Sequence, residues 1–339
     1  AWYEDKDNDG YYEVTIGGKG GIVANSDSNS LFNFIGNSVE NQEVTITGLN
    51  NLETGLTTNM AYMFRQCKAS SLDVSSFNTE NVTNMRYMFY NCSNLTSLDL
   101  NNFDTSKVTT LFSTFEGCSN LKELKVNNWN TSNVVEMGEK AGYWGYGGTF
   151  KNCSSLVELD ISKWDTSNVV GMGQMFAGCS SLTSLDVSNF NTSNVKSMFR
   201  MFSGCKNLTE LDVSNFDTKN VINIECMFAY CSGLTNLDVS DFDTSNVTSM
   251  RAMFRQCSKL TSLNLSNFNT DKVTDMWYMF YDDVSLKELD ITNFNVENVT
   301  DWTSMFSNVP STIQITTNQN TANWIKENFP SYTNITITN

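Results

Sequence analysis

A block of 26 residues repeats along most of this 339-residue chain, and its period constrains the fold more than any other feature. The copy at 179–204 reads CSSLTSLDVSNFNTSNVKSMFRMFSG. Repeats of about 20 to 30 residues that bury an apolar face only against their neighbours form solenoids. We therefore expect one elongated domain and not two globular ones. The leucine column of the repeat comprises Leu72, Leu98, Leu124, Leu159, Leu185, Leu211, Leu237, Leu263 and Leu289.

One repeat, residues 92–118, shows what each block is expected to form. Its first apolar residues follow the pattern L-x-x-L-x-L, and Leu98 and Leu100 alternate with polar residues as in a β-strand. Asp104-Thr105-Ser106 are types typical of turns and helix N-caps. Val108, Leu111, Phe115 and Cys118 then have the spacing of a short α- or 3₁₀-helix. We predict an α/β solenoid, a right-handed superhelix with a parallel β-sheet on one face, short helical segments on the other and a cap at each end.

The repeat resembles that of the BspA-like leucine-rich-repeat surface proteins, in the 26-residue form known from mycoplasma and bacterial surface proteins. The matching segments include 88–111, MFYNCSNLTSLDLNNFDTSKVTTL, and 253–276, MFRQCSKLTSLNLSNFNTDKVTDM. The resemblance covers about residues 59–309. It implies a secreted or cell-surface protein, often an adhesin that engages a host protein or glycan, on another cell or on the matrix.

The repeat divides the chain into three parts. Residues 1–58 lack it and are expected to form an N-terminal cap, with a first strand at Val44-Thr45-Ile46. The leucine-rich-repeat solenoid is expected at 59–309. Residues 310–339 begin at Pro310 and are expected to cover the other open end of the core, with a helix at 321–329.

The composition excludes several classes of function. A net charge of −16 with no cluster of Lys and Arg argues against nucleic acid and against a bare anionic membrane as partners. No apolar run is long enough for insertion into a membrane. The chain has no histidine, which removes the commonest general base and metal ligand, so we expect no enzyme and no required cofactor. The chain begins at Ala1 without a signal-like segment, and we expect it to be part of a longer surface-anchored protein.

Three polar or sulfur-containing columns accompany the leucines. The cysteines are interpreted as free buried thiols, because stacked side chains point in parallel and not toward each other, although metal or redox chemistry is the alternative. Cys226 lies off this column and is expected to be accessible. The aspartates are interpreted as a solvent-exposed row that is hydrogen-bonded to nearby Ser and Thr. The alternative is a row that binds cations or basic partners. The threonines read as turn and cap residues, with ice binding as a remote alternative. The cysteine column is Cys67, Cys92, Cys118, Cys153, Cys179, Cys205, Cys231 and Cys257.

The variable residues beside the Met-Phe pair of each repeat are candidates for ligand binding. They are rich in Tyr, Trp and Arg, which are enriched at binding hot spots. The alternative is that these aromatic residues only cover neighbouring coils. The candidate residues are Tyr87, Tyr90, Trp277, Tyr278 and Tyr281.

An insertion at 139–147 breaks the period and provides a second candidate. It places Tyr143, Trp144 and Tyr146 among glycines, and insertions in solenoids often carry binding. The alternative is a loop that folds back on the next coil, where Gly171 and Gly173 replace larger residues.

A candidate calcium loop lies near the N-terminus. Asp5, Asp7 and Asp9 precede Gly10 in the pattern D-x-D-x-D-G, and Glu13 could add a ligand. The twelfth position of an EF-hand loop would be Ile16 and not Glu, so the match to that motif fails. An ordinary acidic turn is the alternative. The sequence thus predicts a non-enzymatic binding module, with a structural spacer or stalk without a ligand as the alternative.

Overall fold

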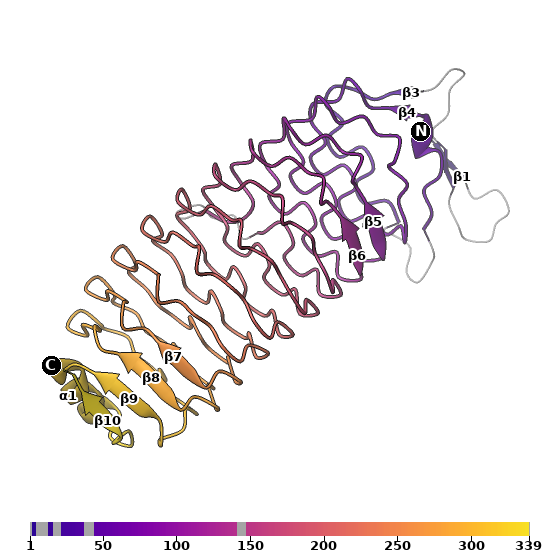
Figure 1. Cartoon of the computed structure of the whole chain (residues 1–339). Coiled ribbons are helices and arrows are strands. Elements are labelled where there is room, and N and C mark those ends of the chain that lie inside the picture. Colours follow the sequence, from indigo (N-terminus) through magenta and orange to yellow (C-terminus); the bar gives the residue numbers. More distant parts are fainter. Residues whose placement is uncertain (1, 5–12, 16–21, 37–43, 141–146, 339) are drawn as a thin grey trace.

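The chain forms a single elongated solenoid whose coils lie side by side from one end to the other (Figure 1). This computed structural model describes residues 2–4, 13–15, 22–36, 44–140 and 147–338. The 26-residue period is thus expressed as one coil per repeat, as predicted.

One face of the solenoid carries parallel strands in the register of the repeat. β5 (Ser97–Asp99) pairs with β6 (Glu123–Lys125), and Leu98 lies opposite Leu124. At the other end a four-stranded parallel sheet has the order β10-β9-β8-β7. In the coils between these two sheets, the equivalent residues of the repeat are not assigned as strands. The strands of the larger sheet are β7 (Ser262–Asn264), β8 (Glu288–Ile291), β9 (Gln314–Thr317) and β10 (Ile335–Ile337).

The opposite face consists of turns, and the prediction of short helical segments is wrong. Residues 59–140 and 147–309 contain no helix. Tyr62 and Gln66 have φ values of 58° and 56°, which is the left-handed region required at the third position of a type II turn. The Tyr62 amide donates to the carbonyl of Arg86 in the next coil at 2.9 Å, while the Met63 amide donates to the Met60 carbonyl at 3.2 Å. Amides that alternate between the neighbouring coil and the local turn cannot form a helix. We call this side of the solenoid the turn face.

The core is a set of stacked columns. Phenylalanines of the Met-Phe pair, which is Thr-Phe at Phe115 and Phe150, stack from coil to coil with ring centroids 5.5–6.0 Å apart between Phe64 and Phe306. The turn after each strand adds a second aromatic column that includes Phe216, which is 2% exposed. Offset stacking and burial of large rings are the main source of stability in such a core.

The cysteine column is buried, and its thiols are free. From Cys92 to Cys257, each Sγ of the column donates to the carbonyl of a phenylalanine in the preceding coil, as Cys118 does to Phe89 at 3.1 Å. Burial raises the pKa of Cys179 to about 12. Cys226 is half-buried, and burial raises its pKa against the opposing effect of Arg200. These thiols are therefore hydrogen-bonded core residues, and Cys226 is not an activated nucleophile.

The threonine and aspartate columns are explained by hydrogen bonds within the scaffold. The Thr105 hydroxyl is buried and donates to the carbonyl of Asn130 in the next coil at 2.9 Å. It therefore caps no helix, contrary to prediction. Asp186 is exposed and accepts from the Ser188 amide at 3.0 Å and from its hydroxyl at 2.6 Å. The Ser188 hydroxyl and amide lower the pKa of the Asp186 carboxyl.

The C-terminal cap continues the hydrogen-bond ladder of the coils. The helix α1 (Gln319–Asn328) covers the end of the core and buries Ile325. Asn318 accepts from the Thr321 amide and donates through Nδ2 to the Phe294 carbonyl at 2.8 Å. Inside the solenoid, Asn215 donates in the same way to the carbonyl of a phenylalanine one coil earlier. The cap therefore supplies the contact that a further repeat would have made.

The N-terminal part contains short strands and a partial coil. Val44 makes only an isolated bridge to Ala69, so the strand predicted at 44–46 is absent. The Phe32 amide donates to the Met63 carbonyl at 2.7 Å, which places Phe32 on the stack of core rings. The named elements are β1 (Trp2–Glu4), antiparallel to β2 (Glu13–Thr15), β3 (Ile22–Val23), parallel to β4 (Leu52–Glu53), and the 3₁₀-helix η1 (Leu49–Asn51).

Candidate binding face

All the arginines of the chain lie on the turn face, beside the Met-Phe pairs. Each guanidinium carbon lies 3.9–5.8 Å from the centroid of at least one aromatic ring, within the range of cation–π contacts. The strand face carries the aspartate row instead, so the two faces differ in charge. The five arginines are Arg65, Arg86, Arg200, Arg251 and Arg255.

One group of these residues, the N-terminal cluster, spans the first coils. Arg65 lies 5.7 Å from the ring of Tyr90, and Arg86 lies 5.3 Å from the ring of Tyr87. Tyr87 contacts Tyr90 edge to face at 5.2 Å. The predicted site residues Tyr87 and Tyr90 are thus together and half-buried. The cluster is Phe34, Tyr62, Arg65, Arg86, Tyr87, Tyr90 and Phe112.

A second group, the C-terminal cluster, brings together the other three predicted residues. The Trp277 and Tyr278 rings lie 3.7 Å apart, and Tyr278 contacts Tyr281 edge to face at 4.6 Å. Arg251 lies over Trp277 at 3.9 Å, and Arg255 lies 4.9 Å from Tyr278. The cluster is Tyr230, Arg251, Arg255, Trp277, Tyr278 and Tyr281.

The insertion starts and ends beside the N-terminal cluster. Gly138 and Gly148 form an antiparallel bridge at its base. A side chain at Gly147 would overlap the Phe112 ring at 2.7 Å, so only glycine allows this close approach. Tyr143, Trp144 and Tyr146 lie outside the described residues.

The stem of the insertion also folds back onto the next coil. Glu139 and Gly173 exchange amide–carbonyl hydrogen bonds at 2.9 and 3.0 Å, and a side chain at Gly173 would meet the Glu139 carboxylate at 2.6 Å. The close contact with Glu139 therefore explains why residue 173 is glycine.

Two carboxyl groups of this stem have opposite pKa shifts. Burial raises the pKa of Glu139, against a hydrogen bond from the Ser197 hydroxyl at 3.0 Å. Burial also acts on Glu136, but Lys140 at 2.8 Å and Arg86 at 3.8 Å outweigh it and lower its pKa. Glu136 thus joins the insertion to the N-terminal cluster through an ion pair.

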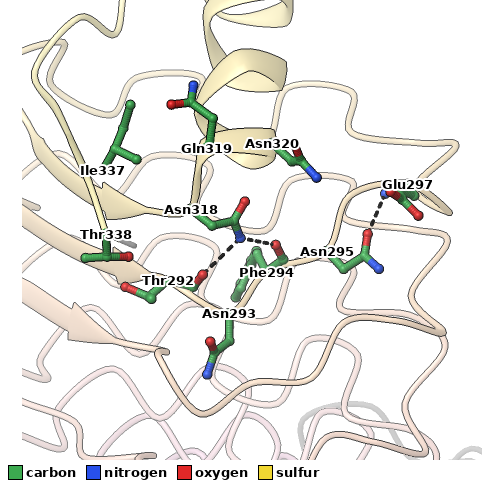
Figure 2. Close-up of a pocket in the computed structure, with 10 residues that line it drawn as sticks. All are labelled: Thr292, Asn293, Phe294, Asn295, Glu297, Asn318, Gln319, Asn320, Ile337 and Thr338. Carbon is green, nitrogen blue, oxygen red and sulfur yellow. Dashed lines mark hydrogen bonds between the residues drawn. The ribbon is translucent and has the colours of Figure 1, made fainter.

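A cavity of about 590 Å³ lies at the C-terminal end, between the last coil, the start of α1 and β10 (Figure 2). Asn318 and Asn320 line it beside Asn293, Asn295 and Glu297. Sequence reasoning missed it, because it forms where the cap replaces a repeat. Its walls are mainly polar, and the Asn318 amide is already occupied by carbonyls of the last coil.

The remaining sequence candidates give no site in the described part of the chain. Asp5, Asp7 and Asp9 lie outside the described residues, and Glu13 is the first residue of β2. Within the described ranges, no group of three His, Cys, Asp or Glu side chains could hold a metal ion. No described helix has the length and apolar character needed to cross a membrane.

A comparison with protein families identifies the repeat. A family described as "Mycoplasma protein of unknown function, DUF285" matches residues 32–141, 146–237 and 230–336. The chain belongs to this family. Membership confirms the predicted relationship to the mycoplasma-type BspA-like surface repeats. A comparison with curated proteins gave no match.

Two solved structures were found at low similarity to the chain. A leucine-rich cell surface protein from Faecalibacterium prausnitzii A2-165 is 17% identical, covering 79% of this chain and 85% of its own, with a TM-score of 0.32. A leucine-rich-repeat protein from Eubacterium ventriosum ATCC 27560 is 13% identical, covering 87% and 88%, with a TM-score of 0.26.

Proposed function

We propose that this DUF285 member is a non-enzymatic binding module, exposed on a cell surface or secreted, that engages a ligand through its turn face. The observation that carries this proposal is the placement of every arginine of the chain on that face, each beside an aromatic ring. A core needs none of these guanidinium groups, because the buried columns are complete without them.

The composition of both clusters is that of binding hot spots. Tyr, Trp and Arg dominate such sites because they combine large apolar area with directional hydrogen bonds. Tyr87, Tyr90, Tyr278 and Tyr281 are half-buried, so each presents part of its ring to solvent while the rest is held by its neighbours. Side chains fixed in this way lose little conformational entropy when a ligand binds.

The insertion enlarges the proposed surface next to the N-terminal cluster. Its stem is anchored by the Glu136–Arg86 ion pair and by the contact of Gly147 with Phe112. We propose that Tyr143, Trp144 and Tyr146 extend the binding face from this stem. Calcium binding by Asp5, Asp7, Asp9 and Glu13 remains a separate proposal, which calorimetry with Ca²⁺ would test.

The experiment is a binding survey against arrays of glycans and extracellular-matrix proteins, followed by two matched variants. Tyr281→Ala alters the turn face, and Asn236→Ala alters an exposed residue of the strand face. For any ligand found, Tyr281→Ala is expected to weaken binding at least tenfold, a hot-spot effect of about 1.4 kcal/mol or more, and Asn236→Ala to leave it unchanged. A survey without any ligand would favour the alternative, a structural spacer of a larger surface protein.

A further inference from the structure

The two clusters contain the same arrangement around Arg65 and Arg255. Both arginines occur in the sequence M-F-R-Q-C, at 63–67 and 253–257. We call each arginine with its flanking rings an arginine cage. In the coil before, a ring lies 5.0 Å from Arg65 and 5.1 Å from Arg255, namely Phe34 and Tyr230. In the coil after, Tyr90 and Tyr281 lie 5.7 and 5.1 Å away.

The equivalence extends to the backbone. The amide of Phe34 donates to the Arg65 carbonyl at 2.8 Å, and the amide of Tyr230 donates to the Arg255 carbonyl at 2.6 Å. The two cages therefore occupy the same place in the repeat, and each guanidinium has an aromatic ring from the coil before and a tyrosine from the coil after. The third ring differs, because Tyr62 belongs to the coil of Arg65 and Tyr278 to the coil after Arg255.

Neither caged guanidinium has a carboxylate within 4.0 Å among the residues that the structure describes. The Nε atom of Arg255 is buried and has no hydrogen-bond partner there. Arg86, by contrast, pairs with Glu136. Rings on two sides of a guanidinium leave its in-plane N–H donors for a flat, bidentate acceptor, and a carboxylate has that geometry.

The coils between the cages lack this arrangement. At the position of Arg65, the first of these coils carries Tyr90, and the next two carry Glu116 and Lys151, which pair with each other at 3.0 Å. The remaining three carry Ala177, Ser203 and Ala229. The cages are seven coils apart, which corresponds to roughly 35–40 Å at the usual spacing of neighbouring strands and the slightly wider spacing of the rings. The turn face thus presents two similar arginine sites at a fixed separation.

We propose that the two cages bind one long polysaccharide that carries carboxylate groups at intervals along its chain. This rests on the proposed binding function. A polymer repeats one chemical unit, so it offers the same carboxylate to both cages, whereas a single folded protein would need two copies of one epitope. The net charge of −16 disfavours polyanions as dense as nucleic acids but tolerates a sparsely charged glycan, since exposed charges are screened beyond about 8 Å at physiological salt.

The test compares long hyaluronan, hyaluronan tetrasaccharide and neutral dextran by calorimetry and surface plasmon resonance. We expect no binding of dextran, weak binding of two tetrasaccharides per protein, and binding of the long chain tighter by a factor of about 100 or more, because the second contact is intramolecular.

Four cage variants and one control assign the effect to the cages. Arg65→Gln and Arg255→Gln are each expected to remove the gain for the long chain and to leave one tetrasaccharide site. Lys206→Gln, which removes an exposed cation outside both clusters with the same change in charge, is expected to bind like the unaltered protein. Arg65→Lys and Arg255→Lys keep the charge and the aliphatic stem but not the planar fork, so they are expected to behave like the glutamine variants in a fold that circular dichroism shows to be intact.

Other results would overturn the proposal in distinguishable ways. If the long chain binds no tighter than the tetrasaccharide, or if Lys206→Gln has the same effect as the cage variants, paired recognition is wrong while the binding function stands. If only a matrix protein binds, the polysaccharide is the wrong class of ligand. If the survey finds no ligand of any kind, the proposed function itself fails.

Discussion

Asp283 is a buried carboxyl group in the cysteine column, and replacing it with cysteine should stabilise the protein in a pH-dependent manner. It lies 26 residues after Cys257, is fully buried, and accepts from the Cys257 amide through Oδ1 at 2.8 Å. Its Oδ2 atom is buried without a partner among the described residues. In Asp283→Cys, the thiol would stand where the ladder places a donor to the Phe254 carbonyl, as Cys257 donates to Phe228 at 3.1 Å.

The expected gain in stability has two sources, the unpaired carboxyl oxygen of Asp283 and the difference between its pKa values in the folded and unfolded protein. A buried polar atom without a partner costs about 1–3 kcal/mol. Burial also raises the pKa of Asp283 well above its ordinary value of 3.8, against the hydrogen bond from Cys257. The neutral Asp283 carboxyl therefore makes its full contribution to the free energy of unfolding below pH 3.8. That contribution is lost as the pH rises toward the raised pKa of the folded protein. The loss is about 1.4 kcal/mol for each pH unit over which only the unfolded chain ionises.

The assay is urea denaturation of the unaltered protein, Asp283→Cys, Asp283→Asn and the exposed control Asp241→Asn from pH 4 to 8. We expect the free energy of unfolding of Asp283→Cys and Asp283→Asn to rise relative to that of the unaltered protein as the pH increases. Asp241→Asn is expected to have the same pH dependence as the unaltered protein. A difference that does not depend on pH, or an Asp283→Cys protein that is less stable at pH 7, would refute the reasoning.

The other columns give three more expectations. Phe216→Ala should lower the free energy of unfolding by about 3–5 kcal/mol in urea denaturation, and a cost below about 1 kcal/mol would contradict its place in the core. Thiol titration of the folded protein should find only Cys226 reactive, and slowly, since its pKa is raised; reaction of Cys179 before unfolding would argue against the buried ladder. Ser188→Ala should move the pKa of Asp186 up toward 3.8 in an NMR titration, because the serine hydroxyl lowers it. The variant should also lose less stability than the unaltered protein as the pH falls below 3.8. A pKa of Asp186 that does not change would exclude the hydrogen bond from the Ser188 hydroxyl.

The core could be predicted from the period alone. Residues that recur at equal steps must stack when each coil packs only on its neighbours. The pairing of Leu263 with Leu289 has the predicted step of 26, and the cysteines are unbridged as expected. The sequence analysis did not single out Asp283, although it occupies the next step of the column, 26 residues after Cys257.

The turn face could not be predicted, because local spacing does not reveal distant acceptors. Met60, Phe64 and Cys67 have a spacing that also fits a helix. The acceptor of the Tyr62 amide is the Arg86 carbonyl, 24 residues away, and this bond between coils selects turns. A single repeat therefore has an ambiguous pattern that only stacking resolves.

The candidate site was predicted as a set of positions but not as an arrangement. The sequence indicated which aromatic residues flank the Met-Phe pairs, and the structure gathers five of them into two clusters. The rings that flank each arginine come from the coils before and after it, as Phe34 and Tyr90 do for Arg65. Such contacts depend on the alignment of coils, which becomes available only when the fold is known.

The way in which Asn318 closes the stack bears on how proteins of this kind change in length. It binds the Phe294 carbonyl, and every complete coil offers a carbonyl at the equivalent position. The other contacts of the cap, such as that of Trp324 with Trp302, involve only the last coils and stay in place when an internal coil is added or removed. Unequal recombination between blocks could then add or delete whole coils without any compensating change at the terminus. Deleting a coil that contributes to neither cage, such as 180–205, would also shorten the distance between the two arginine cages by one step. The distance between the two binding sites would thus change in steps of one coil when a 26-residue repeat is duplicated or deleted.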